Sequence, residues 1–489
     1  MKQAAVIGGG FGGIAAALRL RSRGADVTLY ERLDALGGRA QVLKKNGYIH
    51  DAGPTVITAP YLFYELFELF GEKLDDYLEF RPLDPWYRFN FHDQTQFDYG
   101  PNREKMLSQI EKISPNDVGG YLKMLKEANA IFELGYQKLA GHPFHKLMTM
   151  IKYAPAIIKM RGYESVYTFV SRYLEHPNLR QAFSIQPLLV GGNPFQTSSI
   201  YALIHSLEQK WGIYFCMGGT GKLVKELEKL MLRQGIKIKY QHDVEHLSTS
   251  NNEISELHFT NGHSHKFDII VSNADPIQVS TELIGRKKIS LHNAFVNKFA
   301  KHSMGLFVLF FGSKKQYKNV AHHTIWMGPR YKGLLEDIFD HHKLADDFSI
   351  YLHRPTCTDT SFAPKGHDSY YALVPVPNLK GNQNWDKIKE KFANNILDAL
   401  GKTIMPGIKE NARDIFSMTP KDFKSNYRTP FGSGFSIAPI LRQSAWFRTH
   451  NQDGKYKNLF YVDKCKYFLV YLKLSFKCTS YSFRCFILS

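Results

Sequence analysis

Cysteine is scarce in this sequence. Its 489 residues contain five cysteines, Cys216, Cys357, Cys465, Cys478 and Cys485, with no C-x-x-C pair and an odd total. A disulfide framework is therefore excluded as the basis of the fold, and a reducing compartment, the cytoplasm, is predicted. Long apolar runs are also missing, because no stretch approaches the roughly 18 uninterrupted apolar residues of a transmembrane helix. We expect no transmembrane helix.

Acidic residues are outnumbered by basic ones. Lys and Arg total 63 against 45 Asp and Glu, which gives a formal net charge of +18. The basic residues are dispersed and no nucleic-acid motif accompanies them, so we predict no nucleic-acid partner. Solvated surface charge is the simple explanation of the surplus. An anionic membrane surface is the functional alternative, since each well-placed Lys or Arg adds about 1 kcal/mol of attraction.

One segment, residues 145–161, combines apolar and basic side chains. It interleaves apolar side chains with Lys146, Lys152, Lys159 and Arg161. Such a basic amphipathic piece suits a peripheral membrane interface. The alternative is a surface helix whose apolar face is buried in the core.

Glycine is concentrated near the start of the chain. The apolar run 4–7 meets a turn in which Gly8, Gly10 and Gly13 follow the G-x-G-x-x-G spacing. Gly8 permits the tight turn, Gly10 lets the backbone approach a pyrophosphate, and Gly13 lets the following helix lie close to the strand. We expect that helix over 12–23 and a second strand over 26–30. Glu31, at the end of this strand, is placed to accept hydrogen bonds from an adenosine ribose.

Two further motifs indicate which nucleotide binds. Leu36-Gly37-Gly38-Arg39 follows Glu31, and Asp51-Ala52-Gly53-Pro54-Thr55 comes next. The pair resembles the flavin signature of the amine oxidase and carotenoid desaturase superfamily. The resemblance implies that the Gly38-Arg39 turn lies on the phosphates of FAD and that residues 51–55 pass beside its isoalloxazine ring. It also implies that the main chain at Val244 meets the adenine.

The cofactor-binding residues that follow from the turn and the resemblance form one set: Gly8, Gly10, Gly13, Glu31, Gly38, Arg39, Gly53, Pro54, Thr55 and Val244.

Motifs in the central region indicate which group within this superfamily the chain resembles. Residues 188–223 carry Gly191-Gly192-Asn193-Pro194-Phe195 and Gly218-Gly219-Thr220-Gly221, and Gly328-Pro329-Arg330-Tyr331 follows later. In their residues and in their order along the chain, these motifs resemble those of the bacterial phytoene desaturases. The resemblance extends to about Val462. This resemblance implies an FAD-dependent enzyme that dehydrogenates 15-cis-phytoene stepwise towards lycopene. Its partners would be a long-chain carotenoid, a membrane surface and an electron acceptor such as a quinone or oxygen.

The expected fold is α/β, with a Rossmann-like FAD-binding domain, a mixed-sheet substrate domain and a helical insertion. The FAD-binding domain is predicted over 1–75, 215–285 and 440–462. The substrate domain is predicted over 76–130 and 286–439. A helical region that faces the membrane or forms a lid is expected over 131–214.

Catalytic residues are harder to predict. A carbocation that develops on a polyene is delocalised, so a strong base is not strictly required. Asp51 is the one candidate for the proton or for tuning the flavin, because it is the acid of the motif that passes the ring. A structural role in holding that turn is the alternative. Glu164, Tyr201 and His205 lie in the family-like central region, but sequence alone does not orient them.

Histidine pairs raise the question of a metal. His322-His323 and His341-His342 have no convergent Cys, Asp or Glu spacing, so no metal site is predicted.

The C-terminal end departs from the family. Residues 463–489 contain no Gly, Ala, Pro or Glu, but three of the five cysteines and seven Phe or Tyr. In the family this position carries a glycine-rich motif and a final helix whose N-terminus faces the flavin. A shifted reading frame or a recombined end explains the change, and a divergent extra strand over 472–478 is the alternative. The rival functions are therefore an inactive or impaired flavoprotein, a desaturase of another carotenoid, or an amine oxidase of the same superfamily.

Overall fold

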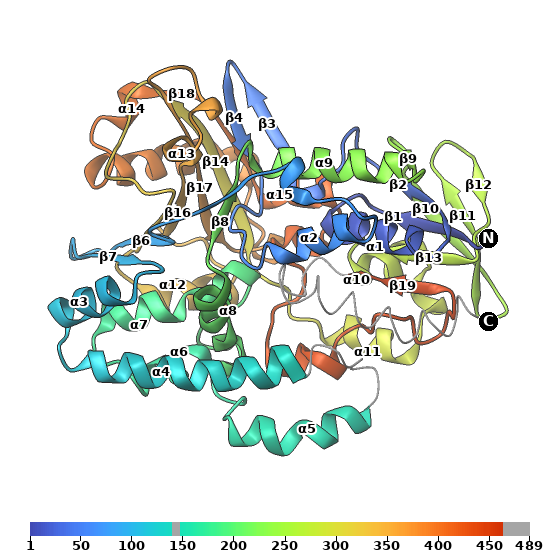
Figure 1. The fold of residues 1–489 in the computed structure, drawn as a ribbon, viewed down its shortest axis with the longest axis horizontal. Coiled ribbons are helices and arrows are strands. Elements are labelled where there is room, and N and C mark those ends of the chain that lie inside the picture. The colour runs from blue at the N-terminus through green and yellow to red at the C-terminus, as the bar shows by residue number, and fades with distance from the viewer. Residues whose placement is uncertain (139–146, 463–489) are drawn as a thin grey trace.

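A five-stranded parallel sheet forms around the glycine-rich turn. The computed structural model describes residues 1–138 and 147–462. The strand order is β19-β13-β1-β2-β9, and every neighbouring pair is parallel (Figure 1). Four of the strands are short, mainly apolar runs that are buried on both faces, as parallel strands usually are: β1 (Gln3–Ile7), β2 (Asp26–Tyr30), β13 (Ile269–Ser272) and β19 (Leu459–Tyr461). The edge strand β9 (Lys237–Lys239) exposes its two lysines.

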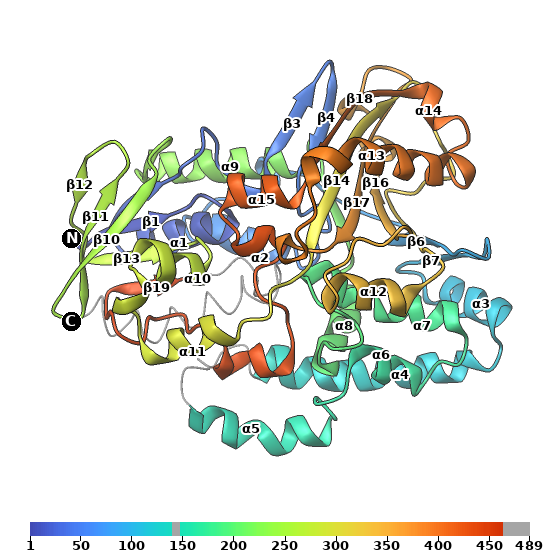
Figure 2. The same ribbon diagram turned by 180° about the vertical axis from the view of Figure 1, so that it is seen from behind.

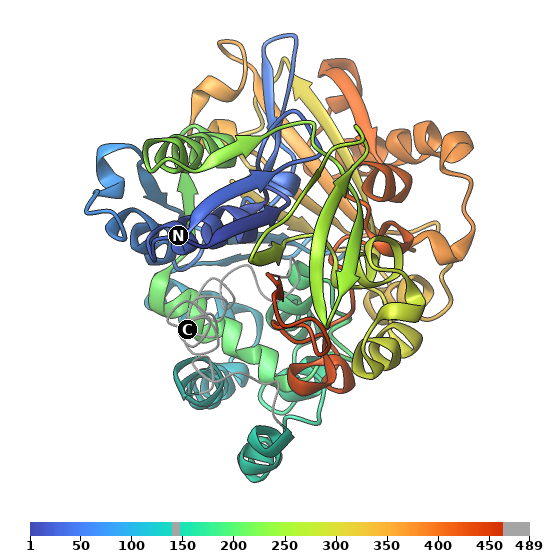
Figure 3. The ribbon, with the colours of Figure 1, turned by 90° about the vertical axis from the view of Figure 1, so that its right-hand side faces the viewer.

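Helices and small sheets surround this sheet. An antiparallel unit of β10 (Val244–Ser250), β11 (Glu253–Phe259) and β12 (Ser264–His265) lies beside it, in front in Figure 3. Two further antiparallel pairs are the hairpin of β3 (Val42–Lys45) with β4 (Tyr48–Asp51), and the pair of β5 (Phe80–Pro82) with β8 (Tyr214–Cys216), which joins segments far apart in the sequence. The helices here are α1 (Phe11–Arg21), α2 (Tyr61–Glu68), α9 (Gly219–Arg233) and α10 (Pro276–Gln278).

A seven-stranded mixed sheet forms the second layer. Its order is β18-β14-β17-β16-β15-β6-β7, with β15 parallel to β6 and the other pairs antiparallel. Its strands are β6 (Tyr87–Asn90), β7 (Gln96–Tyr99), β14 (Gly305–Ser313), β15 (His323–Trp326), β16 (Ile350–His353), β17 (Asp368–Val376) and β18 (Ala412–Met418). Strand β14, which lies between β18 and β17, is buried at every residue, in agreement with its nearly continuous apolar sequence.

Most remaining helices lie on the lower side of the molecule in Figures 1 and 2, while α13, α14 and α15 lie near the top. The helix α5 stands apart from the body in both views. These helices are α3 (Arg103–Ile113), α4 (Asp117–Phe132), α5 (Leu147–Lys159), α6 (Val166–Ser171), α7 (Pro177–Ser184), α8 (Leu203–Trp211), α11 (Leu291–Phe299), α12 (Tyr331–Phe339), α13 (Trp385–Lys402), α14 (Ile408–Asn411) and α15 (Pro420–Tyr427).

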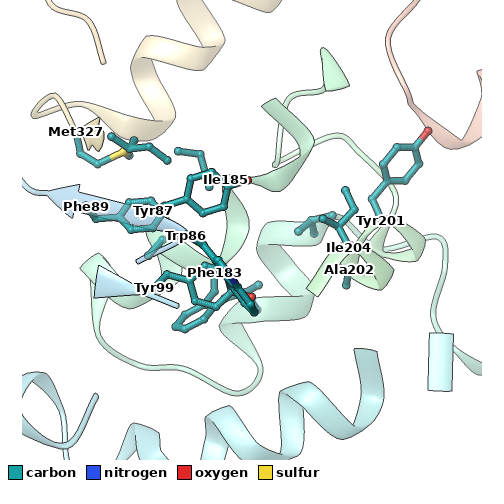
Figure 4. Close-up of a cluster of buried hydrophobic side chains, with 14 of the residues drawn as sticks. Trp86, Tyr87, Phe89, Tyr99, Phe183, Ile185, Tyr201, Ala202, Ile204 and Met327 are labelled. Atoms are coloured by element: carbon teal, nitrogen blue, oxygen red, sulfur yellow. The ribbon is translucent and has the colours of Figure 1, made fainter. Parts of the chain in front are cut away.

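An aromatic cluster fills the space between this sheet and the helices. Trp86, Tyr87 and Tyr99 come from the region of β6 and β7, and Phe183 reaches them from α7 (Figure 4). The rings of Tyr99 and Phe183 meet edge to face with centroids 5.6 Å apart. The abundant Phe and Tyr of the sequence therefore contribute to a core on the side of the molecule away from the glycine-rich turn.

The predicted fold class is confirmed, and most predicted elements are present. The strand predicted over 26–30 has these bounds, and the helix predicted over 12–23 is α1, two residues shorter at its C-terminal end. Within the two described ranges, no helix has both the length and the apolar character that a membrane span requires. The strand considered for 472–478 lies outside the described residues.

Candidate active site

The glycine-rich turn joins β1 to α1 at the carboxyl edge of the parallel sheet. Gly8 has φ +93°, a left-handed conformation that favours glycine. A Cβ added to Gly13 would lie 2.0 Å from the carbonyl oxygen of Gly8, so only glycine allows α1 to approach the turn this closely. Gly10 is the N-cap of α1 and provides no side-chain cap, and the first turn carries no acid. The N-terminal end of α1 therefore has no side-chain cap and directs its backbone amides and positive dipole towards an anion.

Glu31 is held next to this turn. Its side chain is 7% exposed, and Oε2 accepts a hydrogen bond of 2.7 Å from the amide of Gly9. Oε1 accepts a bond of 2.9 Å from the amide of Leu33. Each carboxylate oxygen has a second lone pair, so Glu31 can accept hydroxyl groups of a ribose while it stays fixed. Val244, at the start of β10, is buried in the same hydrophobic cluster as Ile7 and Tyr30.

The Gly37-Gly38-Arg39 turn lies against the glycine-rich turn. The amide of Gly37 donates to the carbonyl oxygen of Gly9 at 2.8 Å, and Gly38 has φ +57°. Two guanidinium nitrogens of Arg39, Nε and Nη2, are buried with no hydrogen-bond partner among the described residues. A buried cationic group left without an acceptor is costly, which indicates an anionic ligand here. Gly53 lies behind Arg39, because an added Cβ would be 2.1 Å from the carbonyl oxygen of Arg39.

Asn273 also lies at the turn, and sequence reasoning did not single it out. A Cβ on Gly10 would be 2.6 Å from Asn273 Nδ2, and one on Gly12 would be 2.6 Å from Asn273 Oδ1. Its place directly after β13, at the carboxyl edge of the sheet, is the signal that could have revealed it. Val462 reaches the same edge, since its amide donates to Ser272 at 2.9 Å and its carbonyl oxygen would lie 3.3 Å from a Cβ on Gly12. Val462, the last described residue, therefore lies next to the turn.

Asp51 lies under the N-terminal end of α9. The side chain is 1% exposed, and Oδ1 accepts a hydrogen bond of 2.9 Å from Thr220 Oγ1. Burial raises the pKa of Asp51 to about 6, against the hydrogen bonds from Thr220 and Gly221 that lower it. A Cβ on Gly219 would lie 2.7 Å from both carboxylate oxygens, so the helix end covers this acid closely. These contacts favour the structural role of Asp51.

Thr55 connects its motif to the second sheet. Its Oγ1 lies 2.7 Å from the hydroxyl of Tyr371 and 3.1 Å from that of Tyr351. The Tyr351 hydroxyl in turn lies 2.7 Å from His323 Nδ1. A chain of hydrogen bonds thus runs from the motif at residues 51–55 into the interior of the seven-stranded sheet.

Comparison with known proteins identifies the family. Residues 11–464 match the model of the flavin containing amine oxidoreductases. The chain is 42% identical over 463 residues to a phytoene desaturase (lycopene-forming) of Pantoea ananas, with 94% of each chain covered. The chain belongs to the flavin-containing amine oxidoreductases.

Two further proteins are similar to the chain. A phytoene desaturase (neurosporene-forming) of Cereibacter sphaeroides is 37% identical over 465 residues, covering 94% of this chain and 90% of that protein. The solved structure of putrescine oxidase bound to putrescine has a TM-score of 0.65 and 12% identity, covering 99% of this chain and 98% of the other. At that identity the likeness concerns the fold alone.

The prediction that the cofactor is FAD is confirmed by the family. The observed residues fit such a cofactor. The open helix N-terminus and the unpartnered nitrogens of Arg39 suit a pyrophosphate, and Glu31 suits a ribose. The individual site residues, including Pro54, stay predictions.

Other ionisable groups of this flavoprotein lie deeper in the helical side. Glu164, half-buried, pairs with Arg172 at 3.2 Å. His205 Nε2 lies 2.9 Å from the carbonyl oxygen of Phe183, and burial lowers its pKa to about 4. Both have structural partners.

Glu208 was not singled out from the sequence. It is 1% exposed within the aromatic cluster and accepts hydrogen bonds from Tyr99 at 3.1 Å and Tyr87 at 3.4 Å. Burial raises the pKa of Glu208 to about 8, so the carboxyl is largely protonated at neutral pH.

Proposed function

We propose that the chain is an FAD-dependent carotenoid desaturase that converts 15-cis-phytoene stepwise to lycopene in carotenoid biosynthesis. The observation that carries this proposal is the 42% identity, across 94% of both chains, to an enzyme named phytoene desaturase (lycopene-forming). The neurosporene-forming relative is less similar, at 37%, which favours lycopene as the product. The terminal electron acceptor, a quinone or oxygen, stays a prediction.

The residues at the carboxyl edge of the parallel sheet would hold the cofactor. The amides of the turn and Arg39 would bind the pyrophosphate, Glu31 the ribose, and Val244 the adenine. When bound, FAD supplies the acceptor for the hydride removed from the substrate. The segment of Gly53, Pro54 and Thr55 would line the ring side, with Thr55 fixed by two tyrosine hydroxyls.

The arrangement of the sheets supports the domain division predicted from the sequence. All strands of the five-stranded sheet fall within 1–75, 215–285 and 440–462. All strands of the seven-stranded sheet fall within 76–130 and 286–439. We therefore propose an FAD-binding domain and a substrate domain with these bounds, and a helical region over 131–214.

Apolar side chains on the lower side of the molecule support a peripheral membrane position at the cytoplasmic face. Helix α5 exposes Met148, Ile151 and Ile158 by 71%, 55% and 62%. Helix α11 exposes a second stripe, with Leu291 at 92%, Phe295 at 56% and Phe299 at 58%. Both helices lie on the same side in Figures 1 and 2. Burial of such stripes at the headgroup boundary is how interfacial helices bind lipid.

An open cleft lies near the contact of α5 with the body. It has a volume of about 510 Å³ and is lined by Gln196, Ile440, Leu441, Arg442 and Phe447. The helix α5 contacts the adjacent turn η13 (Ala445–Phe447). An apolar cleft next to a lipid-binding face is a suitable entrance for an insoluble polyene, and we propose this role for it.

Liposome flotation tests the membrane proposal. Replacing Met148, Ile151 and Ile158 together with serine should reduce binding to phosphatidylglycerol vesicles about tenfold or more, because the apolar area that enters the lipid is removed. The matched control is Leu232→Ser, since Leu232 is 55% exposed on α9, away from α5 in Figure 1. Neutralising Lys152, Lys159 and Arg161 should weaken binding at low salt. Unchanged flotation of both multiple variants would refute this interface. Lys146, the fourth predicted cation, lies outside the described residues.

Expression in cells that accumulate phytoene tests the reaction. Chromatography should resolve lycopene as the main product of the unmodified chain, and a Gly10→Leu variant serves as the flavin-deficient control. A second chain, with a glycine-rich family-type end in place of residues 463–489, distinguishes an impaired flavoprotein from a wrongly proposed reaction. If only this repaired chain forms lycopene, the altered end impairs the flavoprotein. If neither converts phytoene although both retain flavin, the proposed reaction is wrong.

A further inference from the structure

Three histidines converge in the interior of the seven-stranded sheet. His322 directly precedes β15, His323 begins it, and His353 ends β16. The two strands are antiparallel, and His323 and His353 are direct cross-strand partners. The three side chains are 4%, 0% and 1% exposed. Each offers one coordinating nitrogen, and these three nitrogens lie within 4.8 Å of one another. The sequence prediction of no metal site did not consider His353.

The ring nitrogens are arranged as in a ligand set. His322 Nε2 lies 3.2 Å from His353 Nε2. On their other sides, His322 Nδ1 lies 2.7 Å from Thr358 Oγ1, and His323 Nδ1 lies 2.7 Å from the Tyr351 hydroxyl. Hydroxyl or carbonyl partners on the second nitrogen are what orient metal-binding histidines in proteins. Thr358 and Tyr351 therefore fix the two rings in the way an outer ligand shell does.

Two nitrogens of the cluster are left without partners. His323 Nε2 and His353 Nδ1 are buried with no hydrogen bond to any residue that the structure describes. Leaving a buried polar atom unsatisfied costs about 1–3 kcal/mol. A buried cluster of imidazoles that contains unpartnered nitrogens is a suitable donor set for a transition-metal cation.

The distances fit such a cation. Zinc held tetrahedrally at about 2.0–2.1 Å from imidazole nitrogens places those nitrogens about 3.3 Å apart. The separation of 3.2 Å between His322 Nε2 and His353 Nε2 already matches this value. All three coordinating nitrogens lie within 4.8 Å of one another, so the third ring must approach by at most about 1.5 Å. The neighbouring cation Arg354 is neutralised by Asp368, whose carboxylate lies 3.0 Å from its Nε.

We propose that His322, His323 and His353 form a binding site for one divalent transition-metal cation of the zinc, cobalt or nickel type. Three neutral imidazoles leave the fourth position of a tetrahedral ion open to water. The site is connected through Tyr351 to Thr55, and hence to the segment proposed to lie beside the flavin. The metal proposal itself does not depend on the proposed reaction, since it rests on the histidine cluster alone.

Cobalt binding tests the proposal directly. The untagged full-length chain is treated with a chelator, dialysed and titrated with Co²⁺, and the bound metal is measured by absorption spectroscopy and elemental analysis. We expect one Co²⁺ per chain, visible ligand-field bands of a four- or five-coordinate ion, and displacement by Zn²⁺. Failure of the wild-type chain to bind a stoichiometric metal would overturn the proposal.

Variants locate the ion. His323→Gln and His353→Gln should each abolish the cobalt bands, whereas the exposed His341→Gln should leave them unchanged. Since the buried variants carry a risk of misfolding, Tyr351→Phe provides a milder test, because it removes the hydroxyl that orients His323, while Thr55, which this hydroxyl also contacts, keeps its bond of 2.7 Å to Tyr371. It should weaken metal affinity about 10- to 100-fold. Full affinity in Tyr351→Phe together with unchanged stoichiometry in His323→Gln would place any bound metal elsewhere and refute the assignment.

Discussion

Glu208 offers a sharp test of the buried interior. The carboxyl lies in the aromatic cluster around Tyr87 and Tyr99, and burial raises its pKa from the usual 4.5 to about 8. In the unfolded chain the same group ionises near pH 4.5. Between these two values the unfolded state binds fewer protons than the folded state, so this group makes the free energy of unfolding fall as the pH rises. Replacement by glutamine removes this dependence and keeps a hydrogen-bonding amide of similar shape.

The size of the effect follows from the two pKa values. One pKa unit corresponds to about 1.4 kcal/mol, so the wild-type chain should lose about 4 kcal/mol from this group between pH 5 and pH 8.5. The entropy of unfolding, about 2 cal/mol/K per residue, gives about 1 kcal/mol/K for a chain of this length. The Tm of Glu208→Gln, measured against that of the wild type, should therefore rise by about 4 °C over this pH interval.

Thermal unfolding followed by circular dichroism at a series of pH values measures this difference. The matched control is Glu111→Gln, because Glu111 is an exposed residue of α3 and its replacement should leave the pH dependence as in the wild type. The refuting result is a Tm difference between Glu208→Gln and wild type that stays constant from pH 5 to pH 8.5. Glu208 would then be ionised in the folded state, and the inferred apolar environment would be wrong.

Three further predictions concern the flavin site. Gly10→Leu should lower flavin retention about tenfold or more, because the leucine side chain would collide with Asn273 and block the pyrophosphate. The control Gly119→Leu, on an open face of α4, should retain flavin, and normal flavin stoichiometry in purified Gly10→Leu would contradict this site. Asp51→Asn should keep both flavin content and phytoene turnover, since the amide oxygen still accepts a hydrogen bond at the N-terminal end of α9. A fall in turnover of about a hundredfold at constant flavin content would instead indicate that Asp51 transfers a proton. A glycine-rich family-type end in place of residues 463–489 should raise flavin content and reduce aggregation, because a helix N-terminus near the reduced flavin stabilises negative charge; equal flavin content and turnover in both chains would mean that the existing end is functional.

Local sequence signals predicted the parallel sheet and its turn correctly, because they encode requirements of the backbone itself. Gly8 and Gly13 stand where the chain needs a left-handed turn and a close helix approach, and no distant residue is needed to recognise either. The strand over 26–30 and the acid after it follow from the same short-range pattern. The family, the flavin and the fold class are for this reason accessible from the sequence.

Tertiary structure decided the roles of individual polar residues, because those roles depend on partners far away in the chain. Asp51 meets Thr220, 169 residues later, and this contact is what favours a structural role for it. Glu208 is an ordinary acid in the sequence, and only the fold surrounds it with aromatic rings that raise its pKa. His353 joins His322 and His323 only because β15 and β16 pair in one register, and a shift of one residue would turn its side chain to the opposite face of the sheet.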